Sequence, residues 1–270
     1  MNQFMLYNGE LRPATQAIAA ASNRGLRYGD GVFETIKMVN GHMPLLSLHI
    51  DRLTHGLKTL QIPLPPLHSL EKDIIGLCQK NGITGAARVR LMVYRGNGSL
   101  YAADTTLPHM VIQIDPLAPA YLSLNERGWR IDILPGVQKS CDVLANLKSN
   151  NYLPYIMAAL HAQRHELDDC LVLNTYNRIC DAGIANVFWV QAGCIYTPPL
   201  SEGGVAGVMR RYLLQQKEFE CREELCTEEQ LLEAEEVFLT NALYGVRWVK
   251  GFRGRVYECR IARKVYNLMP

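Results

Sequence analysis

The sequence lacks a long apolar run, an excess of charge of one sign and any paired-cysteine motif. Its 270 residues hold 28 lysines and arginines against 26 aspartates and glutamates, a formal net charge of +2. Proteins that bind nucleic acid or anionic membranes need clustered basic charge, so neither partner is expected. No apolar stretch approaches the roughly 20 residues that cross a bilayer, and the first four residues do not begin a secretory signal. Because 48% of the residues are hydrophobic, a folded cytoplasmic protein is expected.

The eight cysteines lack the spacing of a disulfide framework or a zinc site. They are irregularly placed and include no Cys-x-x-Cys pair. Five of them lie in apolar or strand-like segments, where a free cysteine behaves as a small hydrophobe, so reduced thiols are expected. His161 and His165 stand four residues apart on a predicted helix, but no third ligand accompanies them. No metal site is therefore expected.

Turn residues and hydrophobic spacing divide the chain into short strands and helices. Asn-Gly pairs at 8–9 and 40–41 are typical of hairpin turns. In the first half the patterns predict strands over 32–39, 87–94 and 110–114 and helices over 45–60 and 70–79. In the second half they predict strands over 130–134, 170–174, 187–190, 194–197 and 237–240 and helices over 152–166, 207–219 and 228–234. This mixture indicates an α+β fold.

A proline-rich stretch separates the two halves. Pro116 and Pro119 lie close together, and proline biases the residue before it to extended conformations. We therefore expect an N-terminal α+β domain over residues 1–115, a linker over 116–121 and a C-terminal domain over 122–270.

Four features carry residues of chemical interest, and each also has a plain structural interpretation. Lys148 lies among amides and apolar residues, where a partly desolvated lysine can form a Schiff base, although most lysines are solvated surface charges. Residues 203–211 form a glycine-rich turn before a helix, which is either a phosphate cradle or an ordinary loop. Asp181 is either a turn former or the partner of a buried cation. Arg52 is either a surface arginine or a ligand contact.

Together, and in this order, the features resemble the class-IV aminotransferase family, the pyridoxal-phosphate enzymes of fold type IV. The segments that carry the resemblance are 24–34 (the opening signature), 49–53 (the His-x-x-Arg-Leu helix), 147–153 (the Schiff-base lysine), 181–188 (acid-x4-Asn-x-Phe), 204–210 (a phosphate-binding turn) and 240–243 (the last active-site loop). The resemblance runs from about residue 4 to about residue 250. It implies a smaller N-terminal α/β domain and a larger, mixed α/β C-terminal domain that binds the cofactor.

The resemblance also implies roles for individual residues around pyridoxal phosphate. Lys148 would bind the cofactor and move the substrate's Cα proton, and Asp181 would keep the ring nitrogen protonated. The remaining implied cofactor contacts are Arg52, Gly207, Val208, Met209, Thr240 and Asn241, and the implied substrate contacts are Tyr28, Arg95 and Ala242. Family members form homodimers, so a homodimer that acts on a small amino or carboxylate substrate is implied.

One residue departs from the family's pattern. The partner of the ring nitrogen is usually glutamate, and Asp181 is one methylene shorter. A protein that keeps the fold and binds without turnover therefore stays a remote alternative, which the intact Lys148 and Arg52 disfavour.

Within the family, the sequence favours the 4-amino-4-deoxychorismate lyases, which eliminate pyruvate and leave p-aminobenzoate. Asn151 follows Lys148 by the short spacing of the lyases and D-amino-acid enzymes, and residues 45–53, 196–200 and 241–243 look most like the lyases. The Phe-Glu-Thr sequence at 33–35 is closer to the transaminases. An amino-acid transaminase of the D-amino-acid or branched-chain type is therefore the alternative.

Overall fold

The chain opens with a hairpin, as its first Asn-Gly pair predicts. β1 (Phe4–Tyr7) and β2 (Glu10–Pro13) pair antiparallel, and Asn8 and Gly9 between them have φ of 51° and 81°. Glycine adopts such angles without penalty and asparagine tolerates them, so the pair fits a tight turn. The second pair, at 40–41, also makes a tight turn, across which Val39 and His42 form an antiparallel bridge with both backbone hydrogen bonds at 2.9 Å. A helix follows, so this hairpin is limited to one bridging pair.

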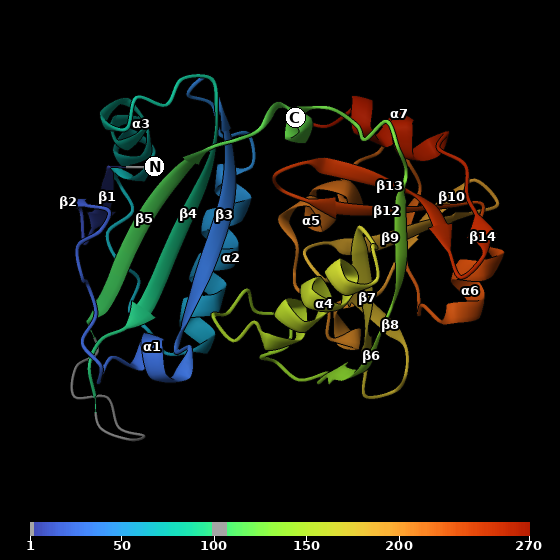
Figure 1. Ribbon diagram of the computed structural model, residues 1–270, viewed down its shortest axis with the longest axis horizontal. Coiled ribbons are helices and arrows are strands. Elements are labelled where there is room, and N and C mark those ends of the chain that lie inside the picture. The colour runs from blue at the N-terminus through green and yellow to red at the C-terminus, as the bar shows by residue number, and fades with distance from the viewer. Residues whose placement is uncertain (1–2, 99–106) are drawn as a thin grey trace. The chain divides into compact units, whose positions relative to one another are not determined.

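A five-stranded antiparallel sheet forms the first unit of the chain (Figure 1). The computed structural model describes residues 3–98 and 107–270, and this unit comprises the described residues up to Pro119 together with Lys148–Asn151. The strand order is β2-β1-β5-β4-β3, in which the long strands are β3 (Gly31–Val39), β4 (Ala86–Arg95) and β5 (Pro108–Pro116). The three strands predicted for this half are confirmed.

Two helices cover one face of this sheet. α2 (Leu46–Thr59) and α3 (Leu70–Lys80) confirm the helices predicted over 45–60 and 70–79. Their apolar residues recur at three- and four-residue steps and so face the sheet together. The shared core includes Leu53, Leu57, Leu70, Ile74 and Leu77 from the helices and Val32, Ile36, Val89, Leu91, Val93 and Ile112 from the strands. A short helix, α1 (Arg24–Tyr28), precedes β3.

A nine-stranded mixed sheet forms the second unit, which comprises residues 120–147 and 152–270. Its order is β11-β10-β9-β12-β13-β6-β7-β8, and β14 pairs with β13. β6 is parallel to β13 and β7, β10 is parallel to β11, and the other pairs are antiparallel. The strands are β6 (Trp129–Lys139), β7 (Asp169–Asn174), β8 (Ile179–Ala182), β9 (Asn186–Gln191), β10 (Cys194–Thr197), β11 (Cys221–Glu223), β12 (Glu236–Asn241), β13 (Gly245–Phe252) and β14 (Arg255–Val256).

Buried apolar side chains lie on both faces of this second sheet. Alternate residues of β9 belong to different clusters, because Val187 and Trp189 lie in one and Phe188 and Val190 in another. The helices of this unit are η1 (Pro119–Leu122, which begins at the boundary), α4 (Leu153–Arg164), η2 (Leu200–Glu202), α5 (Val208–Leu214), α6 (Glu228–Glu233) and α7 (Ile261–Asn267). No helix in the described part of the chain is both long enough and apolar enough to cross a membrane.

Residues 148–151 belong to the first unit, although the expected C-terminal domain of 122–270 includes them. Phe33 N donates to Lys148 O over 2.9 Å, and Asn150 N donates to Gly31 O over 3.0 Å. β3 is an edge strand, and these bonds satisfy main-chain groups along its edge. The chain passes between the units at 119–120, inside the expected linker of 116–121, and again on either side of this segment.

Candidate functional site

A buried ion pair in the first unit holds Arg52, one of the predicted cofactor contacts. Glu34, on β3, accepts hydrogen bonds from Arg52 Nε (2.8 Å to Oε1) and Nη2 (2.5 Å to Oε2). His49, one turn before Arg52 on α2, places Nδ1 2.5 Å from Glu34 Oε2. Because an ionised carboxylate only accepts hydrogen bonds, Nδ1 carries a proton and donates it. Glu34 therefore fixes the guanidinium and is itself fixed by His49.

Glu34 is ionised in this cluster in spite of its burial. Burial raises its pKa, but the charge and hydrogen bonds of Arg52, together with the bond from His49, outweigh burial and lower the pKa to about 2. Burial lowers the pKa of His49, and the cations Arg52 and Lys148 act in the same direction against the opposing effect of Glu34. Neutral His49 and the Glu34–Arg52 pair leave the cluster without net charge.

Glu34→Gln is expected to destabilise the protein at neutral pH and to flatten its response to acid. The folded-state pKa of about 2 lies below the ordinary value of 4.5. Ionised Glu34 thus stabilises the folded protein by about 3 kcal/mol. This stabilisation is fully present above pH 4.5, the ordinary pKa, and is lost as the pH falls toward the folded-state pKa of about 2. The amide NH₂ group of glutamine would also face the N–H donors of Arg52 and His49, where no hydrogen bond can form. Urea unfolding at neutral pH and near pH ~3 checks this, with the exposed Glu71→Gln as control. An unchanged acid response in Glu34→Gln would contradict it.

Lys148, the predicted catalytic residue, is half-buried in the same unit. Its carbonyl group accepts the Phe33 N–H bond described above, and its Nζ lies 4.6 Å from the centroid of the Phe33 ring. An ammonium over an aromatic face is stabilised by the negative charge of that face. Lys148 is also close enough to the Glu34 cluster for its charge to lower the pKa of His49. The structure therefore brings Lys148 and Arg52 to one region of the first unit.

Of the two predicted substrate contacts in this unit, Arg95 is committed to structural bonds. Its Nε donates to Asp30 Oδ2 (2.9 Å), and Nη1 and Nη2 donate to the carbonyl oxygens of Gln61 (3.1 Å) and Leu60 (2.5 Å) after α2. These three bonds use three of the five N–H groups of the guanidinium and brace it against Asp30 and the end of α2. The expected substrate contact of Arg95 stays a prediction. Tyr28, on α1, has a buried hydroxyl without a hydrogen-bond partner among the described residues.

Asp181, the predicted partner of the ring nitrogen, is buried on β8 in the second unit. Its Oδ2 accepts hydrogen bonds from Tyr155 Oη and Val205 N, both over 2.9 Å, and lies 3.8 Å from Lys139 Nζ. Its Oδ1 accepts a bond from Asn186 Nδ2 over 3.1 Å. Burial raises the pKa of Asp181 above its ordinary value, although the charge of Lys139 and the bonds from Val205 and Tyr155 act in the opposite direction.

Asn186 joins Asp181 to the predicted phosphate-binding turn. Its Nδ2 donates to Val205 O as well (2.8 Å), and a Cβ atom added to Gly207 would lie 1.8 Å from its Oδ1. Position 207 therefore requires glycine, because Asn186 occupies the space that a side chain at position 207 would need. Gly207 gives α5 no side-chain cap. The first-turn N–H groups of a helix, here those of Val208 and Met209, have no acceptor within the helix.

Three predicted residues lie where β12 ends. Thr240 pairs with Asn186 of β9 in the sheet register, and its Oγ1 is buried without a hydrogen-bond partner among the described residues. The side chain of Asn241 is engaged: Oδ1 accepts backbone N–H groups two and three positions on, and Nδ2 donates to Ile184 O (3.1 Å). Asn241 thus shapes the turn that contains Ala242 and ties it to the turn after β8.

The sequence assigned no role to the buried residues that hold the predicted ones: Glu34, His49 and Asn186, which lie in the motifs named above, and Lys139 and Tyr155, which lie outside them. A local signal exists for His49, which stands one turn from Arg52 on the same helix. No local signal links Lys139, Tyr155 and Asp181, because 16 and 26 residues separate the successive members.

Comparison with known proteins identifies the family. The model of the family Amino-transferase class IV matches residues 31–252. The aminodeoxychorismate lyase of Vibrio harveyi is 32% identical over 237 residues, 85% of each chain. The crystal structure of 4-amino-4-deoxychorismate lyase from Pseudomonas aeruginosa matches with a TM-score of 0.84 at 28% identity, covering 97% of each chain. The PLP-bound form of a hypothetical aminotransferase from Mycobacterium tuberculosis matches with a TM-score of 0.85 at 19% identity, covering 98% of this chain and 96% of that one, which shows a common fold. The expected fold-type-IV architecture is confirmed, and the chain belongs to the class-IV aminotransferase family.

Proposed function

We propose that this chain is a pyridoxal-phosphate-dependent 4-amino-4-deoxychorismate lyase. The observation that carries the proposal is the 32% identity to the lyase of Vibrio harveyi over 85% of both chains. The short spacing from Lys148 to Asn151 and the loop at 241–243 also favour a lyase. The reaction releases pyruvate from aminodeoxychorismate and leaves p-aminobenzoate.

The polar groups of the second unit fit a phosphorylated pyridine ring. Thr240 Oγ1 is buried and has no hydrogen-bond partner among the described residues, so it has a donor and an acceptor to offer. The first turn of α5 presents backbone N–H groups next to Gly207, a geometry that suits a phosphate. Asp181 is a buried carboxylate of the kind that pairs with a protonated ring nitrogen. We propose that Val208, Met209 and Thr240 contact the phosphate.

The proposed roles of the remaining residues follow from their chemistry. When bound, pyridoxal phosphate withdraws electrons from the α carbon of the substrate. Lys148 would hold the cofactor through its amine, and the same amine would take the substrate's α proton. Arg52, fixed by Glu34, adds a cation for the phosphate. Asp181 keeps the ring nitrogen protonated, and Tyr28 and Ala242 contact the substrate.

A transaminase is the second candidate, because Glu34 belongs to the transaminase-like sequence at 33–35. A lyase ends each turnover with the cofactor as an aldehyde, whereas a transaminase leaves it as an amine. We expect p-aminobenzoate from aminodeoxychorismate, and little change in cofactor absorbance when D-alanine or a branched-chain amino acid is added. Rapid and complete conversion to the pyridoxamine form, or no release of p-aminobenzoate, would contradict the lyase proposal.

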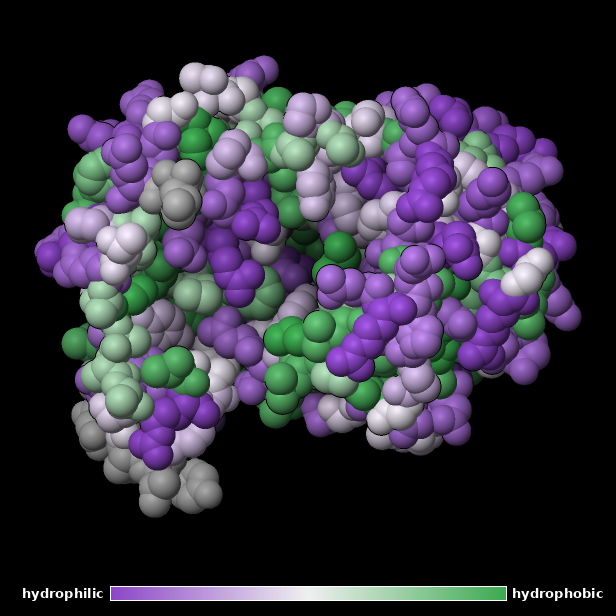
Figure 2. Space-filling model, in the orientation of Figure 1, coloured by the Kyte–Doolittle hydropathy of each residue, from purple (hydrophilic) through white to green (hydrophobic). Residues whose placement is uncertain are grey.

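We also propose that the enzyme is a homodimer that buries one face of α4. Leu153, Ile156, Met157 and Leu160 recur at helical spacing and are 71%, 49%, 44% and 40% exposed. Figure 2 shows hydrophobic side chains gathered where Figure 1 places α4. Large contiguous apolar patches mark protein interfaces. Sedimentation should give twice the mass of one chain, and Ile156→Asp should lower it, unlike Gln163→Asp at an exposed position of α4.

The state of the cysteines supports a cytoplasmic location. All eight are free, and five are buried. Burial raises the pKa of Cys170 and of Cys180 to about 12, so these thiols stay protonated and unreactive. We propose that the protein works in a reducing compartment, the cytoplasm.

A further inference from the structure

A buried chain of polar groups runs from Lys139 through Tyr155 to Asp181 in the second unit. Lys139 Nζ donates to Tyr155 Oη, which donates to Asp181 Oδ2 over 2.9 Å. Lys139 Nζ also donates to Ala145 O (3.3 Å) and lies 4.8 Å from the centroid of the Tyr155 ring. The side chains of Lys139 and Asp181 are only 7% and 3% exposed. All three side chains are therefore removed from solvent.

Stability alone does not account for this arrangement. Removing an ammonium and a carboxylate from water costs several kcal/mol for each ion, and apolar residues of similar volume often give an equally stable core. The burial of Lys139 and Tyr155 is therefore better explained by their effect on Asp181.

The two oxygen atoms of Asp181 have different surroundings. Oδ2 accepts two hydrogen bonds, from Tyr155 and from Val205 N, and also faces Lys139. Oδ1 accepts one side-chain bond, from Asn186. A carboxylate oxygen accepts about two strong hydrogen bonds. Oδ1 is thus the atom suited to receive a further donor.

Building on the proposed function, we propose that Tyr155 and Lys139 are positioning residues for Asp181. These two residues occupy Oδ2 of Asp181 and leave its Oδ1 for the ring nitrogen of pyridoxal phosphate. They also favour the ionised acid, because the charge of Lys139 and the bond from Tyr155 lower the pKa of Asp181 against the effect of burial. A carboxyl group without this support takes up a proton more readily and loses its attraction for a protonated ring nitrogen.

The same pair suits an aspartate where the family pattern has glutamate. The extra methylene would move the carboxylate roughly 1.5 Å farther from the backbone. Tyr155 Oη lies 2.9 Å from Oδ2, so a longer acid could not keep this bond without moving the tyrosine.

The ring nitrogen can be tested separately from the rest of the cofactor. The 1-deaza analogue of pyridoxal phosphate has carbon in place of the ring nitrogen but keeps the aldehyde and the phosphate. Dissociation constants for both compounds are measured by fluorescence titration with the full-length, cofactor-free protein and its Tyr155→Phe, Lys139→Met and Tyr257→Phe variants. Tyr257 is the matched control, because its buried hydroxyl donates to Leu231 O (2.7 Å) and makes no contact with Asp181 among the bonds described.

We expect the wild-type protein to prefer pyridoxal phosphate over the analogue. The preference should fall about tenfold in Tyr155→Phe, the effect of one hydrogen bond to a charged group. The preference for pyridoxal phosphate should also fall in Lys139→Met and should stay unchanged in Tyr257→Phe. An unchanged preference in both Tyr155→Phe and Lys139→Met, or an equal loss of affinity for the two compounds, would overturn the inference. A wild-type protein that binds neither compound would instead overturn the proposed function.

Discussion

Lys148→Ala is expected to lower turnover by about 10⁴-fold or more, even in protein that still takes up cofactor. Alanine offers neither an amine for the cofactor's aldehyde nor a base for the substrate's α proton. The backbone bonds that anchor this segment, from Phe33 N to residue 148 and from Asn150 N to Gly31, do not involve the lysine side chain, so the fold should persist. Release of p-aminobenzoate from aminodeoxychorismate measures the effect.

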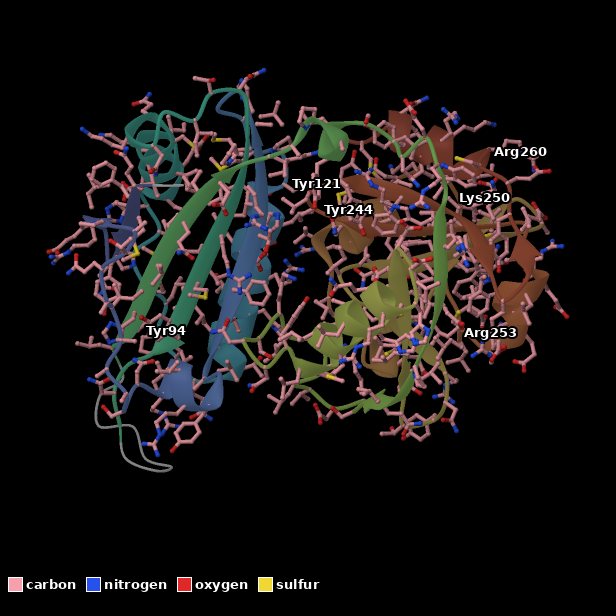
Figure 3. The ribbon with its side chains drawn as sticks, in the orientation of Figure 1. Tyr94, Tyr121, Tyr244, Lys250, Arg253 and Arg260 are labelled. Carbon is pink, nitrogen blue, oxygen red and sulfur yellow. The ribbon has the colours of Figure 1, made fainter. Side chains whose placement is uncertain are left out.

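The matched control is Lys250→Ala. Lys250 is an exposed lysine on β13, labelled in Figure 3, and we expect its variant to turn over at the wild-type rate. Methylamine added to Lys148→Ala should restore part of the activity, because a small amine can replace the missing base. Normal turnover by Lys148→Ala without added amine would overturn the central assignment.

Gly207→Ala is expected to destabilise the second unit by about 2–4 kcal/mol. The new Cβ atom would stand 1.8 Å from Asn186 Oδ1, so Asn186 must move. Its movement breaks two buried hydrogen bonds, to Asp181 and to Val205 O. The backbone of Gly207 has φ of −65°, an ordinary value for alanine, so the whole effect comes from this contact.

Tryptophan fluorescence reports this loss directly, because the three tryptophans, at 129, 189 and 248, all lie in the second unit. Gly251→Ala is the control in the same unit: its new Cβ atom would have nothing closer than 3.8 Å. We expect urea unfolding of Gly251→Ala to resemble that of the wild type. A Gly207→Ala protein as stable as Gly251→Ala would show that Asn186 has another position of equal energy.

The sequence predicts best those elements whose burial pattern is regular. α2 and α3 show one apolar stripe each, and their predicted bounds lie within two residues of those observed. β13 was missed because it mixes Arg247 and Lys250 with apolar residues. Arg247 is nevertheless buried, and it donates to the carbonyl oxygens of Ala120 and Ser123, more than a hundred residues away. Such distant partners leave no local pattern.

The residues of the candidate site are likewise of two kinds, those that a motif predicts and those that no motif predicts. Lys148, Asp181 and Gly207 are recognisable because each lies in a contiguous motif. What surrounds them is not recognisable, since Lys139 and Tyr155 reach Asp181 only through the packing of β6, α4 and β8. The bracing bonds of Arg95 likewise depend on where α2 ends relative to β4, which no motif records.

The edge of β3 is closed by Lys148 and Asn150, which the ribosome adds after the whole of β6 of the second unit. A nascent chain that has emerged only as far as Pro119 holds every strand of the five-stranded sheet, yet its Gly31 and Phe33 still lack the partners that Lys148 and Asn150 provide. Such an open edge invites pairing with other chains. Synthesis of the first unit is thus complete only when residues 148–151 have been made, and a fragment cut at residue 119 should be more prone to aggregate than the whole protein.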